Sequence, residues 1–118
     1  MKFKDTVDAD VVIVSLSGKI LGGEDTVSCR DRLHNYLKAD TKNFVMDMGD
    51  VEWTNSQGLG MLIGCYISVK KAGGNLALAR IANIRDLLEM TRLIEVFDCY
   101  DSVEEAKKSL GIGPQQQR

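Results

Sequence analysis

The 118-residue sequence has no long apolar run, no strong net charge and no cluster of cysteines. No stretch approaches the roughly 18 apolar residues of a membrane-spanning helix. The first five residues lack the apolar core of a secretory signal, so we expect a cytoplasmic protein without a membrane part. The net charge is −2 at pH 7, which gives no general attraction to nucleic acid or acidic membranes. The sequence therefore predicts no direct nucleic-acid binding.

Cysteine and histidine, the usual ligands of zinc, are few, with three and one in the chain. Cys29, Cys65 and Cys99 are far apart and form no Cys-x-x-Cys pair, so neither a zinc site nor a disulfide framework is indicated. We expect them to be buried, reduced thiols. His34 is the single histidine, and its polar neighbours predict a solvated side chain. The glycines of residues 18–23 do not form a nucleotide-binding loop. The sequence thus predicts no metal site and no cofactor.

The composition is that of one globular domain. Hydrophobic residues make up 44% of the chain and charged residues 27%, which is enough apolar material for one core. No core-forming pattern is visible after residue 110. We therefore predict a domain over residues 1–110 and a flexible C-terminal tail over 111–118.

Short apolar segments alternate with amphipathic ones along the chain. The patterns predict strands at residues 2–7, 11–16, 43–48, 76–79 and 96–100, with the first two forming a hairpin. They predict helices at 24–38 and 56–71, a third capped by Asn83 and a fourth capped by Ser102. In the first helix, Val27, Leu33 and Leu37 share the predicted inner face, while Arg30 and Lys38 point outward. Such alternation indicates a layered α/β domain with right-handed crossovers.

The central helix follows a polar turn, Thr54-Asn55-Ser56. Ser56 is a good N-cap residue, and Leu59, Ile63 and Tyr66 lie on one predicted face with Leu62 and Val69 beside them. An exposed hydroxyl at a helix N-terminus is surrounded by free N–H groups and a partial positive charge. The junction therefore suits an anion or a phosphate.

These residues carry a resemblance to a known family. The run 55–60, Asn-Ser-Gln-Gly-Leu-Gly, follows Asp47-Met-Gly-Asp-Val51 and resembles the Asp-Ser-Ser-Gly-Leu-Gly signature of the STAS domain. Residues 14–18 and 83–93 extend the resemblance over most of the chain. It implies an α/β fold: a mixed β-sheet of four to five strands with about four helices packed mainly on one face. It also implies that Ser56 is the phosphoacceptor. Asn55 replaces the family's Asp, and Gln57 its second Ser.

The resemblance further implies an anti-sigma-factor antagonist that is not itself an enzyme. Such a protein binds an anti-sigma factor, which is also its serine kinase, while unphosphorylated. Phosphorylation releases it, and a metal-dependent serine phosphatase resets it, so that sigma-factor-dependent transcription is regulated. Apart from the resemblance, a weak homodimer is among the expected partners. The alternative is a STAS scaffold that is not phosphorylated, or a module that senses a small ligand in a stress-signalling complex.

Several residues near Ser56 are candidates for the signature loop and the partner-binding surface. They are Trp53, Thr54, Asn55, Gln57, Gly58, Leu59, Gly60, Met61 and Gly64. Trp53 either wedges the loop or anchors a partner. Gly60, Gly64 and Ser68 form a strip of small residues that suits either a neighbouring helix or a partner. Met61 and Cys65 are either additional core residues or partner contacts.

Two other classes of protein are disfavoured. A receiver-like domain phosphorylated on Asp47 would need an acidic pair after the first core strand, where residues 15–18 read Ser-Leu-Ser-Gly. A serine enzyme using Ser56 would need the Gly-x-Ser-x-Gly elbow, which is absent, and its base could only be His34.

Overall fold

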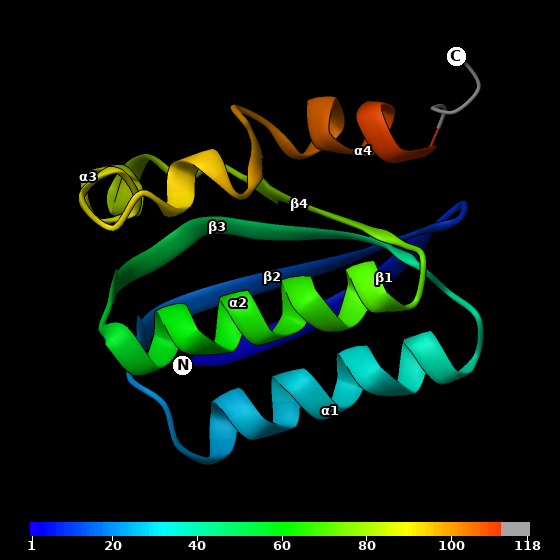
Figure 1. Cartoon of the computed structure of the whole chain (residues 1–118), viewed down its shortest axis with the longest axis horizontal. Helices are drawn as coiled ribbons and strands as arrows, with labels where there is room; N and C mark the ends of the chain where they lie inside the picture. Colours follow the sequence, from blue (N-terminus) through cyan, green and yellow to red (C-terminus); the bar gives the residue numbers. More distant parts are fainter. Residues whose placement is uncertain (112–118) are drawn as a thin grey trace.

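The computed structural model describes residues 1–111 (Figure 1). Gly111 is the last residue of the final helix, α4 (Val103–Gly111). The rest of the predicted tail lies outside the described residues. The division of the chain at residue 110 therefore stays a prediction.

Five strands form one mixed sheet in the order β1-β2-β3-β4-β5. They are β1 (Lys2–Asp8), β2 (Val11–Ile20), β3 (Asn43–Thr54), β4 (Asn75–Ala79) and β5 (Asp98–Tyr100). β1 is antiparallel to β2, and the other neighbours are parallel. This arrangement confirms the predicted hairpin and the mixed sheet.

β2 and β3 are both longer than predicted. Past two irregularities in their pairing, Lys19 still lies opposite Trp53 and Ile20 opposite Thr54. The predicted strand ends at residues 16 and 48 and the predicted turn at Thr54 were wrong, because local sequence does not reveal that two strand ends pair with each other. Gly22 and Gly23 do lie in the connecting loop, with φ of 93° and 96° that favour glycine.

The helices are α1 (Glu24–Lys38), α2 (Ser56–Lys71), α3 (Arg85–Met90) and α4, with 3₁₀ turns at Ala82–Ile84 and Leu93–Glu95. The bounds of α1 and α2 match the prediction. Ser102 caps α4 as expected, since its hydroxyl accepts from the Glu105 N–H at 3.1 Å. Asn83 does not cap α3; its amide instead donates to the Val51 carbonyl at 3.1 Å, because a 3₁₀ turn delays the helix.

The helices cover the two faces of the sheet unequally, as the predicted fold class requires. The larger core lies under α1, α2 and α3, where it contains Phe44, Met46 and Met48 from alternate positions of β3. The intervening Val45 points to a smaller core that includes Ala106 of α4. Figure 1 shows α1 and α2 side by side, with α4 on the other side of the strands.

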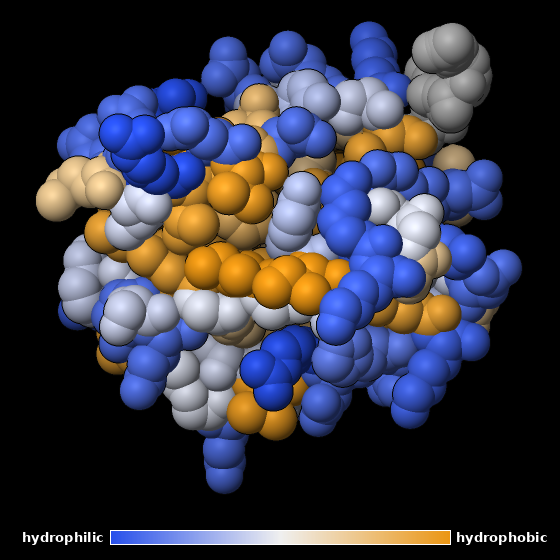
Figure 2. Space-filling model, viewed as in Figure 1, coloured by the Kyte–Doolittle hydropathy of each residue, from blue (hydrophilic) through white to orange (hydrophobic). Residues whose placement is uncertain are grey.

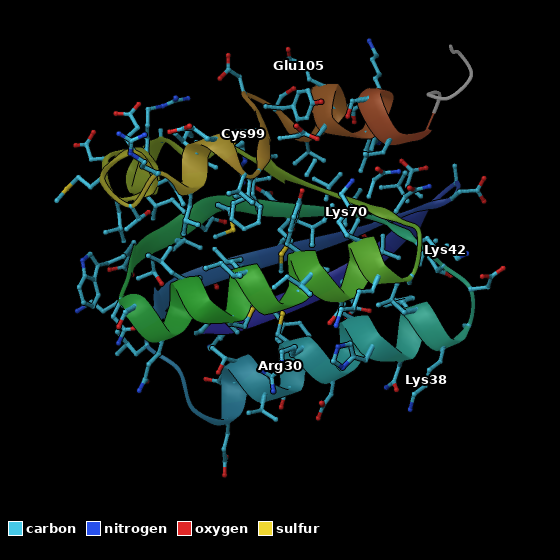
Figure 3. All side chains as sticks on the ribbon, in the orientation of Figure 1. Arg30, Lys38, Lys42, Lys70, Cys99 and Glu105 are labelled. Atoms are coloured by element: carbon cyan, nitrogen blue, oxygen red, sulfur yellow. The ribbon has the colours of Figure 1, made fainter. Side chains whose placement is uncertain are left out.

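The orientation of two helices differs from the prediction. In α1, Val27 is 48% exposed, whereas Thr26, Cys29 and Leu33 face the core. In α2 the buried residues are Gly58, Leu59, Met61, Leu62, Cys65 and Val69. Ile63 and Tyr66 are only half-buried, and Figure 2 shows apolar residues gathered along α2 on the surface. Both helices have apolar residues around more than one face, so their periodicity alone did not determine the rotation. The predicted outward residues Arg30 and Lys38, labelled in Figure 3, are exposed.

Candidate functional site

Ser56 lies exposed at the first position of α2, directly after the end of β3. The prediction that Ser56 is the N-cap of α2 is wrong. That position is taken by Asn55, whose backbone is extended (φ −108°, ψ −173°) and whose Oδ1 accepts from the Gly58 N–H at 3.0 Å. Within residues 1–111 the Ser56 hydroxyl makes no hydrogen bond. The exposed hydroxyl is therefore not used to hold the helix together.

Asn55 also joins two segments of the site. Its Nδ2 donates to the carbonyl of Leu21, in the loop between β2 and α1, at 3.3 Å. The backbone N–H of Asn55 donates to the Ile20 carbonyl at 3.2 Å. An aspartate could make the cap but could not donate to Leu21. This contact ties the start of α2 to the neighbouring loop.

Gly58 and Thr54 pack the start of α2 against the end of β2. A Cβ atom at Gly58 would lie 2.0 Å from the Thr54 Oγ and 2.6 Å from the Ile20 carbonyl oxygen. The buried Thr54 hydroxyl donates to that carbonyl at 3.1 Å. Leu59, 6% exposed, joins the main core. Only glycine allows this close approach, so Gly58 holds the first turn of α2 in place.

The candidate residues divide by exposure. Thr54, Gly58, Leu59 and Met61 are buried, so in this structure they do not present a surface to a partner. Met61 is 4% exposed and belongs to the core, so of the two alternatives left open by the sequence, additional core or partner contact, the structure supports additional core. Gln57 and Gly60 are exposed together with Ser56. Trp53 is 52% exposed, and Leu21 of the adjoining loop is 46% exposed.

The small-residue strip on α2 is largely open. A Cβ atom at Gly60 or Gly64 would have nothing within 4 Å among the described residues. The interpretation that a neighbouring helix of this domain packs against these glycines is therefore wrong. Ser68 alone meets another helix, since its Oγ lies 3.1 Å from Nε2 of His34 on α1. The predicted solvated His34 is in fact half-buried.

The charges around Ser56 differ between the helix and the strand before it: the start of α2 favours an anion, whereas the end of β3 has a negative surface. The first turn of α2 contains no acidic residue, so its N–H groups and partial positive charge are unopposed. Asp50 and Glu52, on the last part of β3, are exposed. A phosphate on Ser56 would thus be stabilised by its own helix.

A family model described as the STAS domain matches residues 2–106. The chain belongs to the STAS domain family. An anti-sigma F factor antagonist from Paenibacillus polymyxa is 23% identical over 103 residues, covering 86% of this chain and 88% of that protein. Among solved structures, a proposed anti-sigma factor antagonist from Thermotoga maritima superimposes with a TM-score of 0.83 at 22% identity, covering 92% of this chain and 94% of the other. The phosphorylated form of the Bacillus cell fate determinant SpoIIAA does so with a TM-score of 0.70 at 16% identity, covering 88% and 95%.

In this STAS domain, Asp47 has a structural partner that sequence reasoning missed. Its carboxylate accepts two hydrogen bonds from the Arg80 guanidinium, at 2.8 and 2.9 Å, and one from the Gly49 N–H at 3.1 Å. The bond to Asp47 raises the pKa of Arg80 further above its usual value. A receiver-like role for Asp47 is disfavoured by this pairing. The signal available in the sequence was slight: Arg80 directly follows β4, whose Ala79 lies opposite Asp47.

The geometry also disfavours a serine enzyme. His34 is bonded to Ser68, which lies about 18 Å along α2 from Ser56 at 1.5 Å per residue. In residues 1–111 no three His, Cys, Asp or Glu side chains gather as metal ligands. None of the helices in that part of the chain is long and apolar enough to cross a membrane.

The cysteines of this STAS domain are free thiols. Burial raises the pKa of Cys65 to about 12 and that of Cys29 to about 11, so both stay protonated and unreactive near neutral pH. The prediction of burial is confirmed for these two, whereas Cys99 is half-buried.

Proposed function

We propose that this chain is an anti-sigma-factor antagonist that binds its anti-sigma factor when Ser56 is unmodified and dissociates when Ser56 is phosphorylated. The observation that supports this most is the exposed Ser56 hydroxyl, which makes no hydrogen bond within residues 1–111 and lies at a helix N-terminus. A kinase can reach it without unfolding the site. The anti-sigma-factor antagonists among its relatives agree with this assignment.

Phosphorylation would act on the interface and leave the fold intact. The phosphate adds about −1.5 to −2 charges at pH 7. The α2 N-terminus stabilises that charge locally by about 0.3–2 kcal/mol. A partner packed over Ser56 must accommodate the dianion, and like charges at an interface cost several kcal/mol. Since about 1.4 kcal/mol corresponds to a tenfold change in affinity, this is enough to release a complex.

The partner surface in this proposal surrounds Ser56. Trp53 from β3 and Leu21 from the β2–α1 loop supply exposed apolar area. Gln57 and Gly60 supply the exposed start of α2. Exposed aromatic residues commonly anchor protein interfaces. The partner is proposed to be an anti-sigma factor with serine kinase activity, reset by a metal-dependent serine phosphatase, all in the cytoplasm.

The experiment measures binding of the purified anti-sigma factor kinase to four forms of the chain. We expect Ser56→Ala to bind like the wild type and Ser56→Asp to lose at least about tenfold in affinity. Ser28→Asp, which adds the same charge at an exposed position on α1, is the control and should bind normally. Mass spectrometry after incubation with kinase and ATP should locate the phosphate on Ser56.

Two results would contradict the proposal. One is phosphate found only on the buried Thr54, or on no residue at all. The other is equal binding by Ser56→Asp and Ser56→Ala. If both variants still bind the partner equally well, the alternative of a STAS scaffold that is not phosphorylated would be favoured. The observation that supports this alternative is the replacement of the family's Asp by Asn55.

A further inference from the structure

One edge of the sheet is formed by β1, a strand of seven residues that pairs only with β2. No other strand within residues 1–111 pairs with its outer side. The N–H and C=O groups on that side are a template for another strand. Val7, near the end of β1, is 56% exposed.

The register tells which backbone groups point outward. Asp8 and Val11 face each other across the two-residue turn Ala9–Asp10, so this pair exchanges hydrogen bonds across the turn. Bonded and non-bonded positions alternate along an antiparallel pair. Asp8, Thr6, Lys4 and Lys2 are therefore hydrogen-bonded to β2 through their backbones. The backbone groups of Phe3, Asp5 and Val7 face outward.

We propose that this edge pairs with β1 of a second copy of the chain, antiparallel, about a two-fold axis at Asp5. A residue that lies a given number of positions before Asp5 then faces the residue the same number of positions after Asp5 in the second copy. Lys2 lies opposite Asp8 of the second copy, and Phe3 lies opposite its Val7. Both contacts occur twice by symmetry. The three outward residues of each strand make about six backbone hydrogen bonds between the copies.

Strand length and charge together select this register. Lysines on an edge strand commonly prevent pairing, but here none faces another lysine. A shift by two residues in one direction would place Lys4 opposite Lys4 of the second copy. A shift in the other direction would leave Lys2 and Phe3 unpaired. Of the three registers, the one centred on Asp5 is the one that pairs the whole strand and sets no lysine opposite a lysine.

The one like-charge contact of this dimer is offset by neighbouring groups. Two Asp5 carboxylates face each other across the axis, but each already accepts from the Arg32 guanidinium at 2.8 Å and from the Tyr36 hydroxyl. Asp8 accepts from Lys107 through Oδ2, which leaves Oδ1 for Lys2 of the second copy. The interface is narrow, so we expect a weak dimer that forms with rising concentration.

Sedimentation equilibrium over a concentration series tests the proposal. The mass of the wild type should rise toward twice that of the monomer. Val7→Pro removes an outward N–H without touching the pairing to β2, and should weaken dimerisation at least about tenfold. Val7→Thr keeps the N–H and should dimerise like the wild type. Circular dichroism shows whether each variant is folded.

A charge reversal identifies the register. Lys2→Glu and Asp8→Lys should each weaken the dimer, and the double variant should restore it. In amide exchange followed by NMR, Phe3, Asp5 and Val7 should become protected as the dimer forms, while Lys4 and Thr6 are protected throughout. A wild type that stays monomeric at about 1 mM, or a dimer that Val7→Pro leaves unchanged, would overturn the proposal.

Discussion

The stretch from Trp53 to Gly64 contains two sets of residues that differ in burial. The buried residues hold the start of α2 in place, and the exposed residues form the surface that a partner can contact. Thr54, Gly58 and Met61 are buried and hold the start of α2 against β2 and the core. Trp53 and Ser56 are exposed beside them. The buried set determines where the Ser56 hydroxyl lies, and the exposed set determines what can bind there. Substitutions in the two sets should therefore affect different measurements.

The largest loss of stability is expected for Met61→Ala. Met61 is 4% exposed in the main core, and truncating such a side chain costs about 3 kcal/mol in the free energy of unfolding. Urea denaturation measures the loss. The folded fraction should still bind the anti-sigma factor with wild-type affinity. Weaker binding at unchanged stability would instead return Met61 to the partner surface.

Gly58→Ala and Gly60→Ala form a matched pair with opposite expected signs. At Gly58 the new methyl group would overlap Thr54 and Ile20, so we expect a loss of about 2 kcal/mol. At Gly60 it would meet no described atom within 4 Å, and replacing glycine inside a helix should stabilise by about 0.5–1 kcal/mol. Thermal or urea unfolding of both variants checks the signs. Equal effects would mean that the close contact at Gly58 is absent in solution.

Replacing the cap residue should have a smaller effect that distinguishes Asn55 from Ser56. Asn55→Ala removes the acceptor for the Gly58 N–H and should cost about 1 kcal/mol. Asn55→Asp keeps that acceptor but loses the donor to Leu21, so its stability should lie between those of the wild type and Asn55→Ala. Ser56→Ala should change the free energy of unfolding by less than about 0.5 kcal/mol. A loss at Ser56→Ala equal to that at Asn55→Ala would make Ser56 the cap after all.

These contrasts also show what could be predicted from the sequence. Local signals were sufficient for the bounds of α1 and α2, and the resemblance pointed to Ser56. The choice of cap was not predictable, because Asn and Ser are equally good caps and only the extended backbone of Asn55 distinguishes them. The burial of Met61 was not predictable either, because α2 is apolar around more than one face and its rotation depends on the sheet and α1.

Longer-range features were the least accessible to sequence reasoning. The pairing of Asp47 with Arg80 joins residues 33 apart in the chain, and it depends on the register between β3 and β4. The extra length of β2 and β3 likewise arises from their pairing with each other. Neither feature has a local pattern. Both follow from how the strands align, which a single sequence indicates only weakly.

The sharpest separation of the two sets is expected for Trp53→Ala, where a small change in stability should accompany a large change in binding. Trp53 is 52% exposed, so its removal should change the free energy of unfolding by less than about 1 kcal/mol. If the partner packs over Ser56, the same substitution should weaken binding of the anti-sigma factor at least about tenfold. Val27→Ala, which removes a side chain of similar exposure from α1, should leave binding unchanged. Isothermal titration and urea unfolding on the same samples make the comparison. Equal binding by Trp53→Ala and Val27→Ala would place the partner elsewhere on the domain, and phosphorylation of Ser56 would then need a different route to affect the complex.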